Sequence, residues 1–244
     1  MTKPPITSFL QVESLLDELL DACLRLAERA IRERGVFRVA LSGGSTPKRL
    51  YERLASTDLD FSRVEWFWGD ERNVPPDHPD SNFRMVREAL LDPAHVPSQN
   101  VFPVPVDVAD PAAAAQRYQR TLKERFGTDL AAGGAFPRWD LVLLGLGDDV
   151  HTASLFPNSP ALEVRDSWFV ENWVEKLDTF RYTLTVPAIR SADEIWLLVT
   201  GSAKREAMAR LLSDERNPQL YPAQAISPTR CFLTDDALPP DQPA

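Results

Sequence analysis

The feature that most constrains the fold is a short apolar run in the middle of the chain, DLVLLGLG at residues 140–147. An alternating pattern would indicate a strand with one face in water. A nearly continuous apolar run of this length is instead typical of a strand that is buried on both faces of a parallel sheet. The run therefore predicts a central strand with helices packed on both sides of the sheet.

Helical patterns lie between this strand and other strand-like segments. Apolar residues at helical spacing predict a helix over residues 9–34, which Gly35 is expected to end. Asp110, directly before Pro111, predicts the start of another helix that reaches about Phe126. Further helices are expected at residues 48–56, at 82–91 behind the N-cap Ser81, and after the glycine turn at 201 as far as 212.

Further strands are predicted at residues 36–41, 64–69, 168–173, 181–186, 194–199 and 229–235. Loops are expected at residues 42–47, 70–81 and 131–134. Because strands and helices alternate throughout, the predicted fold class is α/β, a three-layer αβα sandwich with a mostly parallel sheet.

The composition is that of an ordinary globular protein. The chain has 244 residues, of which 43% are hydrophobic and 26% are charged, so it can bury a sizeable core. It contains no repeat, no low-complexity segment and no clear domain break. We therefore expect a single domain over residues 1–244, with loose ends at 1–8 and 238–244.

The charge and the cysteines exclude several classes of function. The net charge is −9, so nucleic acid and anionic membranes are disfavoured partners, and an anionic small substrate needs a local cluster of bases. Cys23 and Cys231 are far apart and are expected to be reduced, packed thiols. No apolar stretch approaches the ~20 residues of a membrane span, and the N-terminus lacks a basic region followed by an apolar one. We expect a cytoplasmic protein.

The first candidate site is the loop LSGGSTP at residues 41–47, between a predicted strand and a predicted helix. Gly43 and Gly44 allow a sharp turn, and free N–H groups at a helix start attract anions. Ser45 and Thr46 can cap the helix. The loop lacks the spacing of the common nucleotide-binding motifs. The residues alone leave a phosphate site and a plain capped turn equally open.

Two more candidate sites follow predicted strands. Asp70 and Arg72 come at the end of the strand at 64–69, where ligands gather in open α/β sheets, although a solvated ion pair is the alternative. His151 follows the apolar run, and a histidine is ordinarily neutral enough at pH 7 to act as a base. Asp149 could orient its ring. The alternative is a loop histidine bonded to a nearby carboxylate.

The remaining candidates are single basic residues, and a metal site is disfavoured. Lys204 lies in the first turn after a strand and a glycine, where a cation opposes the helix dipole unless an anion is nearby. Arg181 precedes a strand, which is common for a surface residue. His78 and His95 lie in other loops, and the ligand spacings of metal sites are absent. We therefore expect no metal.

Taken together, the segments and their order resemble the 6-phosphogluconolactonase family. The matching segments are LSGGSTPKRLYERLA (41–55), WFWGDERNVPPDHPDSNFRMVREALL (66–91), WDLVLLGLGDDVHTASLFP (139–157), TFRYTLTVPAI (179–189) and LLVTGSAKREAM (197–208). They cover most of the chain from about residue 40 to 210. The GDER loop followed by SNF, together with HTASLFP, is specific.

The resemblance implies a Rossmann-like fold, shared with sugar-phosphate isomerases and deaminases, and hydrolysis of 6-phospho-D-glucono-1,5-lactone in the oxidative pentose phosphate pathway. It implies no cofactor and one small-molecule partner, the phosphorylated sugar lactone. It places the catalytic histidine at His151. It places phosphate-binding and substrate-orienting residues at Ser42, Gly43, Gly44, Arg72, Arg181 and Lys204. We expect a monomer or a weak homodimer.

One position departs from the family pattern. The family usually has glycine between the aspartate and the histidine, whereas this chain has Val150. Glycine tolerates a positive φ there and valine does so poorly. The local backbone is therefore the feature that the resemblance does not predict.

Two alternative functions remain open. An amino-sugar-phosphate isomerase or deaminase of the same fold has an acid a few residues after the histidine, but residues 154–157 here are SLFP. Asp70 matches a carboxylate that the deaminases use, so it stays a candidate site residue. A non-catalytic sugar-phosphate sensor attached to DNA would carry a basic helix-turn-helix, whereas residues 1–35 predict one long amphipathic helix. The lactonase is favoured over both.

Overall fold

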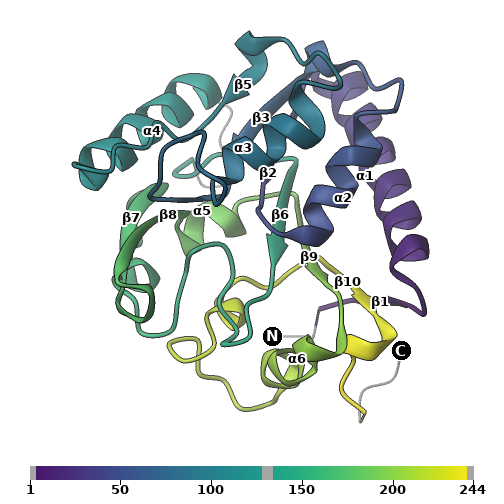
Figure 1. Cartoon of the computed structure of the whole chain (residues 1–244), viewed down its shortest axis with the longest axis vertical. Coiled ribbons are helices and arrows are strands. Elements are labelled where there is room, and N and C mark those ends of the chain that lie inside the picture. Colours follow the sequence, from purple (N-terminus) through teal and green to yellow (C-terminus); the bar gives the residue numbers. More distant parts are fainter. Residues whose placement is uncertain (1–3, 128–133, 241–244) are drawn as a thin grey trace.

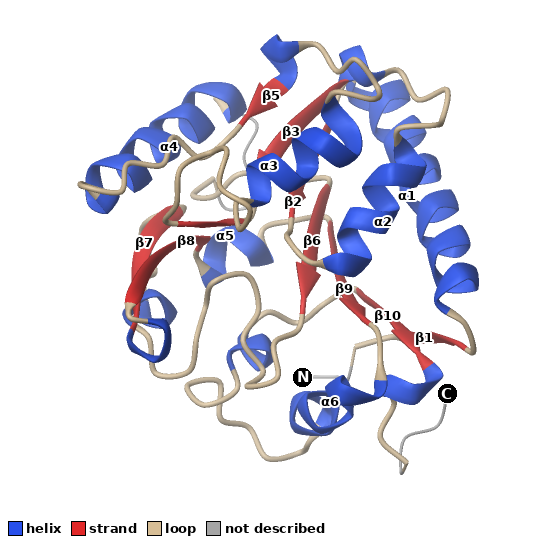
Figure 2. Ribbon diagram, viewed as in Figure 1, coloured by secondary structure: helices blue, strands red, loops and turns tan. Residues whose placement is uncertain are grey.

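The computed structural model describes residues 4–127 and 134–240. Its centre is a seven-stranded sheet with the order β1-β10-β9-β6-β2-β3-β5, in which every neighbouring pair is parallel (Figure 2). The strands of this sheet are β1 (Ile6–Phe9), β2 (Phe37–Leu41), β3 (Val64–Trp68), β5 (Val101–Phe102), β6 (Leu141–Gly145), β9 (Glu194–Val199) and β10 (Arg230–Thr234).

Helices cover the sheet on both sides. In Figure 1, α1, α2 and α3 lie together on one side of the sheet, and α4 and α5 lie on the other. The helices are α1 (Val12–Arg34), α2 (Ser45–Leu54), α3 (Asn82–Val86), which a π-helical turn continues to Leu91, α4 (Pro111–Phe126), α5 (Val186–Arg190) and α6 (Arg205–Leu212). The α/β class and the three layers are therefore confirmed. Within the described ranges, no helix combines the length and the apolar character that crossing a membrane demands.

The helix ends follow the sequence signals. Gly35 ends α1 with a left-handed φ of 79°, and its N–H bonds to the carbonyl of Ile31. The side chains of Ser81 and Asp110 accept hydrogen bonds from the N–H groups of Arg84 and Ala113 at the starts of α3 and α4. The core between the layers is aromatic around Phe67, whose ring packs edge-on against Trp139.

A second, antiparallel sheet lies beside the first. It consists of β4 (Asp70–Arg72), β8 (Thr179–Leu184) and β7 (Phe169–Val174), in that order. Gly69 joins the two sheets, because its N–H donates to the carbonyl of Leu41 and its carbonyl accepts from the N–H of Leu184. The strands expected at 168–173 and 181–186 thus exist as β7 and β8, but they form a separate sheet with β4, and β8 ends at Leu184, before α5 begins at Val186.

Several boundaries differ from the predictions. The N-terminal residues were expected to be loose, but Ile6–Phe9 form the edge strand β1, parallel to β10. The helix expected from residue 9 therefore begins only at Val12. The loop expected at 70–81 opens with strand β4, and β5 was not predicted because it has two residues. Most of the loop expected at 131–134 lies outside the described residues.

The connectivity places a switch point in the middle of the sheet. From β2 the chain continues through β3 to β5 at one edge, then returns to β6 on the other side of β2 and continues to β9 and β10. Where the order reverses, loops leave neighbouring strands in opposite directions and open a crevice at their carboxyl ends. Between β2 and β6, the fold thus provides a place for a ligand.

Candidate functional site

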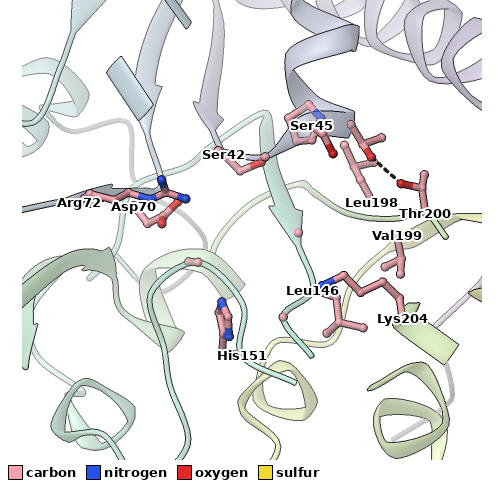
Figure 3. A pocket seen from close by; sticks show the side chains of 17 residues that line it. Ser42, Ser45, Asp70, Arg72, Leu146, His151, Leu198, Val199, Thr200 and Lys204 are labelled. Carbon is pink, nitrogen blue, oxygen red and sulfur yellow. Dashed lines mark hydrogen bonds between the residues drawn. The ribbon is translucent and has the colours of Figure 1, made fainter. Parts of the chain in front are cut away.

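A cavity of about 330 Å³ lies at this crevice. Its walls come from the loops after four adjacent strands, β9, β6, β2 and β3. Figure 3 shows Asp70 and Arg72 on one side, Lys204 on the other, and His151 facing the loop of Ser42 and Ser45 across the cavity. Four separate candidate segments of the sequence therefore meet in one place.

The loop after β2 presents unpaired polar groups to the cavity. The glycine at 44 has a φ of 112°, and α2 begins directly after it without a side-chain cap among the described residues. Of the first three N–H positions, Pro47 has none, which leaves those of Ser45 and Thr46 at the positive end of the helix. The Ser42 hydroxyl is buried and has no hydrogen-bond partner in the described structure. Such a loop is suited to oxygen atoms of an anion.

Neighbouring residues hold this loop in place. The hydroxyl of Tyr51 donates to the carbonyl of Ser42 and accepts from its N–H, which fixes the strand end. The hydroxyls of Thr46 and Thr200 are 2.8 Å apart, so the loops after β2 and β9 touch. A Cβ on Gly43 would lie 2.1 Å from the amide oxygen of Asn82, so this glycine is required for close packing.

The strand β4 brings acidic and basic groups to the opposite wall. Asp70 is buried, lines the cavity, and accepts a 3.1 Å hydrogen bond from the hydroxyl of Ser154. Arg72 lines the cavity and donates to the carbonyl of Asp80. Glu71 turns away and accepts hydrogen bonds from the N–H groups at the start of α3; burial raises its pKa.

Arg181 lies next to Arg72 rather than on the cavity wall. The two arginines are directly opposite each other on β4 and β8, an unfavourable pairing of like charges. Burial first, and then the charge of Arg72, lower the pKa of Arg181. The pair concentrates positive charge beside the cavity in a chain that is acidic overall.

His151 lines the cavity and forms a hydrogen-bonded pair with Asp149, which does not line it. The Oδ1 atom of Asp149 is 2.5 Å from Nδ1 of His151, and Nε2 has no hydrogen-bond partner among the described residues. The ring of Phe156 stacks on the imidazole at 4.1 Å between centroids. A Cβ on Gly147 would lie 2.0 Å from Nδ1, so the imidazole occupies the space that any other residue at 147 would need.

Val150, which stands where the family usually has glycine, has a strained backbone. Its φ is 65°, in the left-handed region, although valine is β-branched. Its side chain is buried in the core, and its carbonyl accepts a hydrogen bond from the N–H of Ala223. Core packing and this hydrogen bond offset a strain of about 1–2 kcal/mol.

Each of the two acids before Val150 pairs with a lysine. Asp148 is 76% exposed and accepts a 2.6 Å hydrogen bond from Nζ of Lys204. Asp149 accepts from Nζ of Lys176 at 2.9 Å. The hydrogen bond with His151, and after it the one from Lys176, hold the pKa of Asp149 well below its usual range.

Residues 4–127 and 134–240 contain no group of three or more His, Cys, Asp or Glu side chains that could hold a metal ion. Cys23 and Cys231 are both buried in the core, away from the cavity.

The structure gathers most of the predicted site residues. Nine of them line the cavity, namely Ser42, Gly43, Gly44, Ser45, Thr46, Asp70, Arg72, His151 and Lys204. Asp149 lies behind His151, and Arg181 lies behind Arg72. Sequence reasoning missed Asn82, Ser154 and Gly147 as supporting residues, although the last is the second glycine of the GLG segment.

A model of the family described as "Glucosamine-6-phosphate isomerases/6-phosphogluconolactonase" matches residues 11–234. The chain belongs to this family. The resemblance drawn from the sequence is therefore confirmed.

Proteins named 6-phosphogluconolactonase resemble this chain over nearly its whole length. A 6-phosphogluconolactonase of Synechocystis sp. is 43% identical over 225 residues, which cover 92% of each chain. One of Nostoc sp. is 43% identical over 215 residues, 88% of each chain. The solved structure of 6-phosphogluconolactonase from Trypanosoma cruzi is 29% identical, with a TM-score of 0.84, and covers 96% of this chain and 95% of its own.

Proposed function

We propose that this protein hydrolyses 6-phospho-D-glucono-1,5-lactone to 6-phospho-D-gluconate, the second step of the oxidative pentose phosphate pathway. The observation that carries the proposal is the hydrogen-bonded pair of His151 and Asp149 at a cavity that also holds an anion-binding loop and Lys204. The relatives named 6-phosphogluconolactonase support the same substrate. No metal or organic cofactor is required, because a base and a water molecule suffice.

The substrate phosphate is placed on the loop after β2. The N–H groups of Ser45 and Thr46 bind its oxygen atoms at the start of α2, and Lys204 supplies a positive charge from the opposite loop. The unpaired hydroxyl of Ser42 donates a further hydrogen bond. Arg72, with Arg181 behind it, orients the sugar end beside Asp70. Binding energy far from the reacting carbon thus positions the lactone.

In this proposal His151 acts first as the general base and then as the general acid. The neutral imidazole removes a proton from water through Nε2 as the water oxygen attacks the lactone carbonyl carbon. The tetrahedral intermediate then collapses, the bond from that carbon to the ring oxygen breaks, and the imidazolium returns the proton to the ring oxygen. Asp149 holds the ring through Nδ1 and stabilises its charged form. A basic side chain or backbone N–H groups stabilise the oxyanion.

The decisive experiment is an assay of the purified protein with freshly prepared 6-phosphogluconolactone, measured against spontaneous hydrolysis. We expect lactone loss to accelerate and glucosamine 6-phosphate to release no ammonia. Ammonia release would select the isomerase or deaminase alternative, which residues 154–157 disfavour because they contain no acid. If the protein acts on neither substrate, the non-catalytic sugar-phosphate sensor is the alternative that remains.

The first prediction concerns the base. His151→Ala is expected to lower kcat by roughly 10²–10⁴-fold, because general-base catalysis contributes about that much. His95→Asn is the matched control, since His95 is exposed in a distant loop with a φ of 50° that asparagine tolerates. A His151→Ala enzyme with near-normal kcat would rule out the proposed role.

The proposal extends to the setting of the protein. We treat residues 1–244 as a single domain that works as a monomer or weak homodimer in the cytoplasm, with a sugar phosphate lactone as its small-molecule partner. The net charge of −9 supports the exclusion of nucleic acid and anionic membranes. Size-exclusion chromatography across a range of concentrations measures the oligomeric state.

A further inference from the structure

The carboxylate of Asp149 is shared between two side chains. Its Oδ1 atom contacts His151 at 2.5 Å, and its Oδ2 atom accepts a hydrogen bond from Nζ of Lys176 at 2.9 Å. Lys176 lies in the turn Glu175–Leu177 between β7 and β8, in the second sheet, and does not line the cavity that His151 faces. The lysine therefore reaches the site only through the carboxylate.

Other charged groups around the pair have different partners. Asp148, on the same loop, is bonded to Lys204 from the turn before α6. Across the cavity, Arg72 on β4 bonds to a backbone carbonyl, and Asp70 accepts from a serine. Glu175 lies beside Lys176 on the rim of a second cavity that Asp149 also lines. In the described part of the chain, Lys176 is the cation in direct contact with Asp149.

The contact between Lys176 and Asp149 changes the charge that His151 experiences. A carboxylate that contacts an imidazole alone favours the imidazolium, and a histidine that is protonated at neutral pH cannot accept a proton from water. A cation on the other carboxylate oxygen offsets part of that effect and fixes both oxygen atoms in place. The contact also raises the pKa of Lys176, so this lysine stays charged throughout the working range of pH.

We propose that Lys176 is a positioning residue for the proposed hydrolysis: it anchors the Asp149 carboxylate and offsets its charge, so that His151 stays unprotonated to lower pH than Asp149 alone would allow. This inference rests on the proposed function. With Lys176, a residue from the turn between β7 and β8 of the second sheet joins Asp149 and His151, which follow β6. Because Lys176 is 67% exposed, solvent screens its charge and the effect is moderate.

The test compares Lys176→Met with Lys176→Arg and with the control Lys123→Met. Lys123 is an exposed lysine of α4 whose ammonium group lies over the ring of Trp168. The chain has three histidines, so the imidazole signals are readily assigned by NMR in the ligand-free protein. Lys176→Met is expected to raise the titration midpoint of the His151 signal by roughly half a pH unit. Lys176→Arg and Lys123→Met are expected to leave it unchanged.

The activity profile supplies the second readout. In Lys176→Met the acidic limb of kcat/KM is expected to move to higher pH by the same amount, with KM unchanged on the plateau and with restoration by arginine. A folded Lys176→Met protein whose His151 signal titrates as in the wild type overturns the inference, whatever its activity. A shifted signal in a protein that never accelerates lactone loss overturns the proposed function and leaves the charge coupling in place.

Discussion

At the scale of single residues, the loop that carries His151 combines strain with close packing. Val150 has a positive φ, and Ala153 and Asn158 nearby have φ values of 48° and 57°. Gly147 leaves room for the imidazole, and the N–H of Gly147 donates to the carbonyl of His151 at 2.8 Å. Such a loop keeps its shape because the surrounding contacts outweigh its local preference.

The strain at Val150 leads to a prediction about stability. Val150→Ala keeps the positive φ and removes buried methyl groups, so it should lower the free energy of unfolding by about 2 kcal/mol. Val150→Gly removes more of the side chain but also relieves the backbone. At a position with an ordinary backbone, a protein with glycine is less stable than the same protein with alanine. At position 150 we expect the glycine variant to be the more stable of the two by about 1 kcal/mol, because its φ is positive. Urea unfolding of both variants measures the difference, and a more stable alanine variant would show that the backbone at 150 is unstrained.

The sequence pattern predicted the pairing of Asp149 with His151, but it did not predict the contacts made by Lys176 and Asn82. The spacing of Asp149 and His151 indicated their pairing, because two residues apart in a loop their side chains can meet. Lys176 could not be found in this way, since it comes from a turn between two strands whose place beside Asp149 depends on the second sheet. The close approach of Asn82 to Gly43 likewise requires the packing of α3 against the loop after β2.

At the scale of elements, the site depends on loops from four strands that meet at one edge. The long elements were predictable, since α1, α4 and β6 have strong periodic or continuous apolar patterns. The short strands β4 and β5 were not, because two or three residues carry no pattern. Nor does an apolar segment reveal which sheet it joins, so the separation of β7 and β8 from the parallel sheet was missed.

The loop after β9 carries a prediction about substrate binding. Lys204→Ala is expected to raise KM by about 10–100-fold with a small effect on kcat, because a charged hydrogen bond to the phosphate contributes about 1.5–3 kcal/mol and that group does not react. Arg205→Ala is the control, since the guanidinium of this next residue donates to the carbonyl of Asp236 instead. Steady-state kinetics on the lactone checks both variants, and an unchanged KM for Lys204→Ala would remove the lysine from the phosphate site.

At the scale of the whole molecule, the core contains two thiols that affect stability at high pH. Cys23 lies on α1 and Cys231 on β10, and burial raises the pKa of each to about 12. In the unfolded chain both thiols ionise near pH 9. Their contribution to stability is therefore fully present below about pH 9 and is lost as the pH rises toward 12.

Urea unfolding at two pH values measures the loss of stability that the ionisation of the two thiols causes. Between pH 7 and pH 10.5 the two thiols together should lower the free energy of unfolding by about 4 kcal/mol, about 2 kcal/mol for each. A Cys23→Ala, Cys231→Ala double variant should lose correspondingly less over the same interval, in urea unfolding at both pH values. Equal losses in the two proteins would show that other groups dominate the alkaline limb.

The pairing of β1 with β10 determines when the seven-stranded sheet can be completed during synthesis. Residues 6–9 leave the ribosome before the other described strands of the seven-stranded sheet, yet their partner strand, residues 230–234, is made after all of these strands. The wall of the cavity that carries Lys204 also comes late, after the loops of β2, β3 and β6 have been made. A nascent chain therefore holds an unpaired β1 and an incomplete binding site until β9, the loop that carries Lys204, and β10 have emerged.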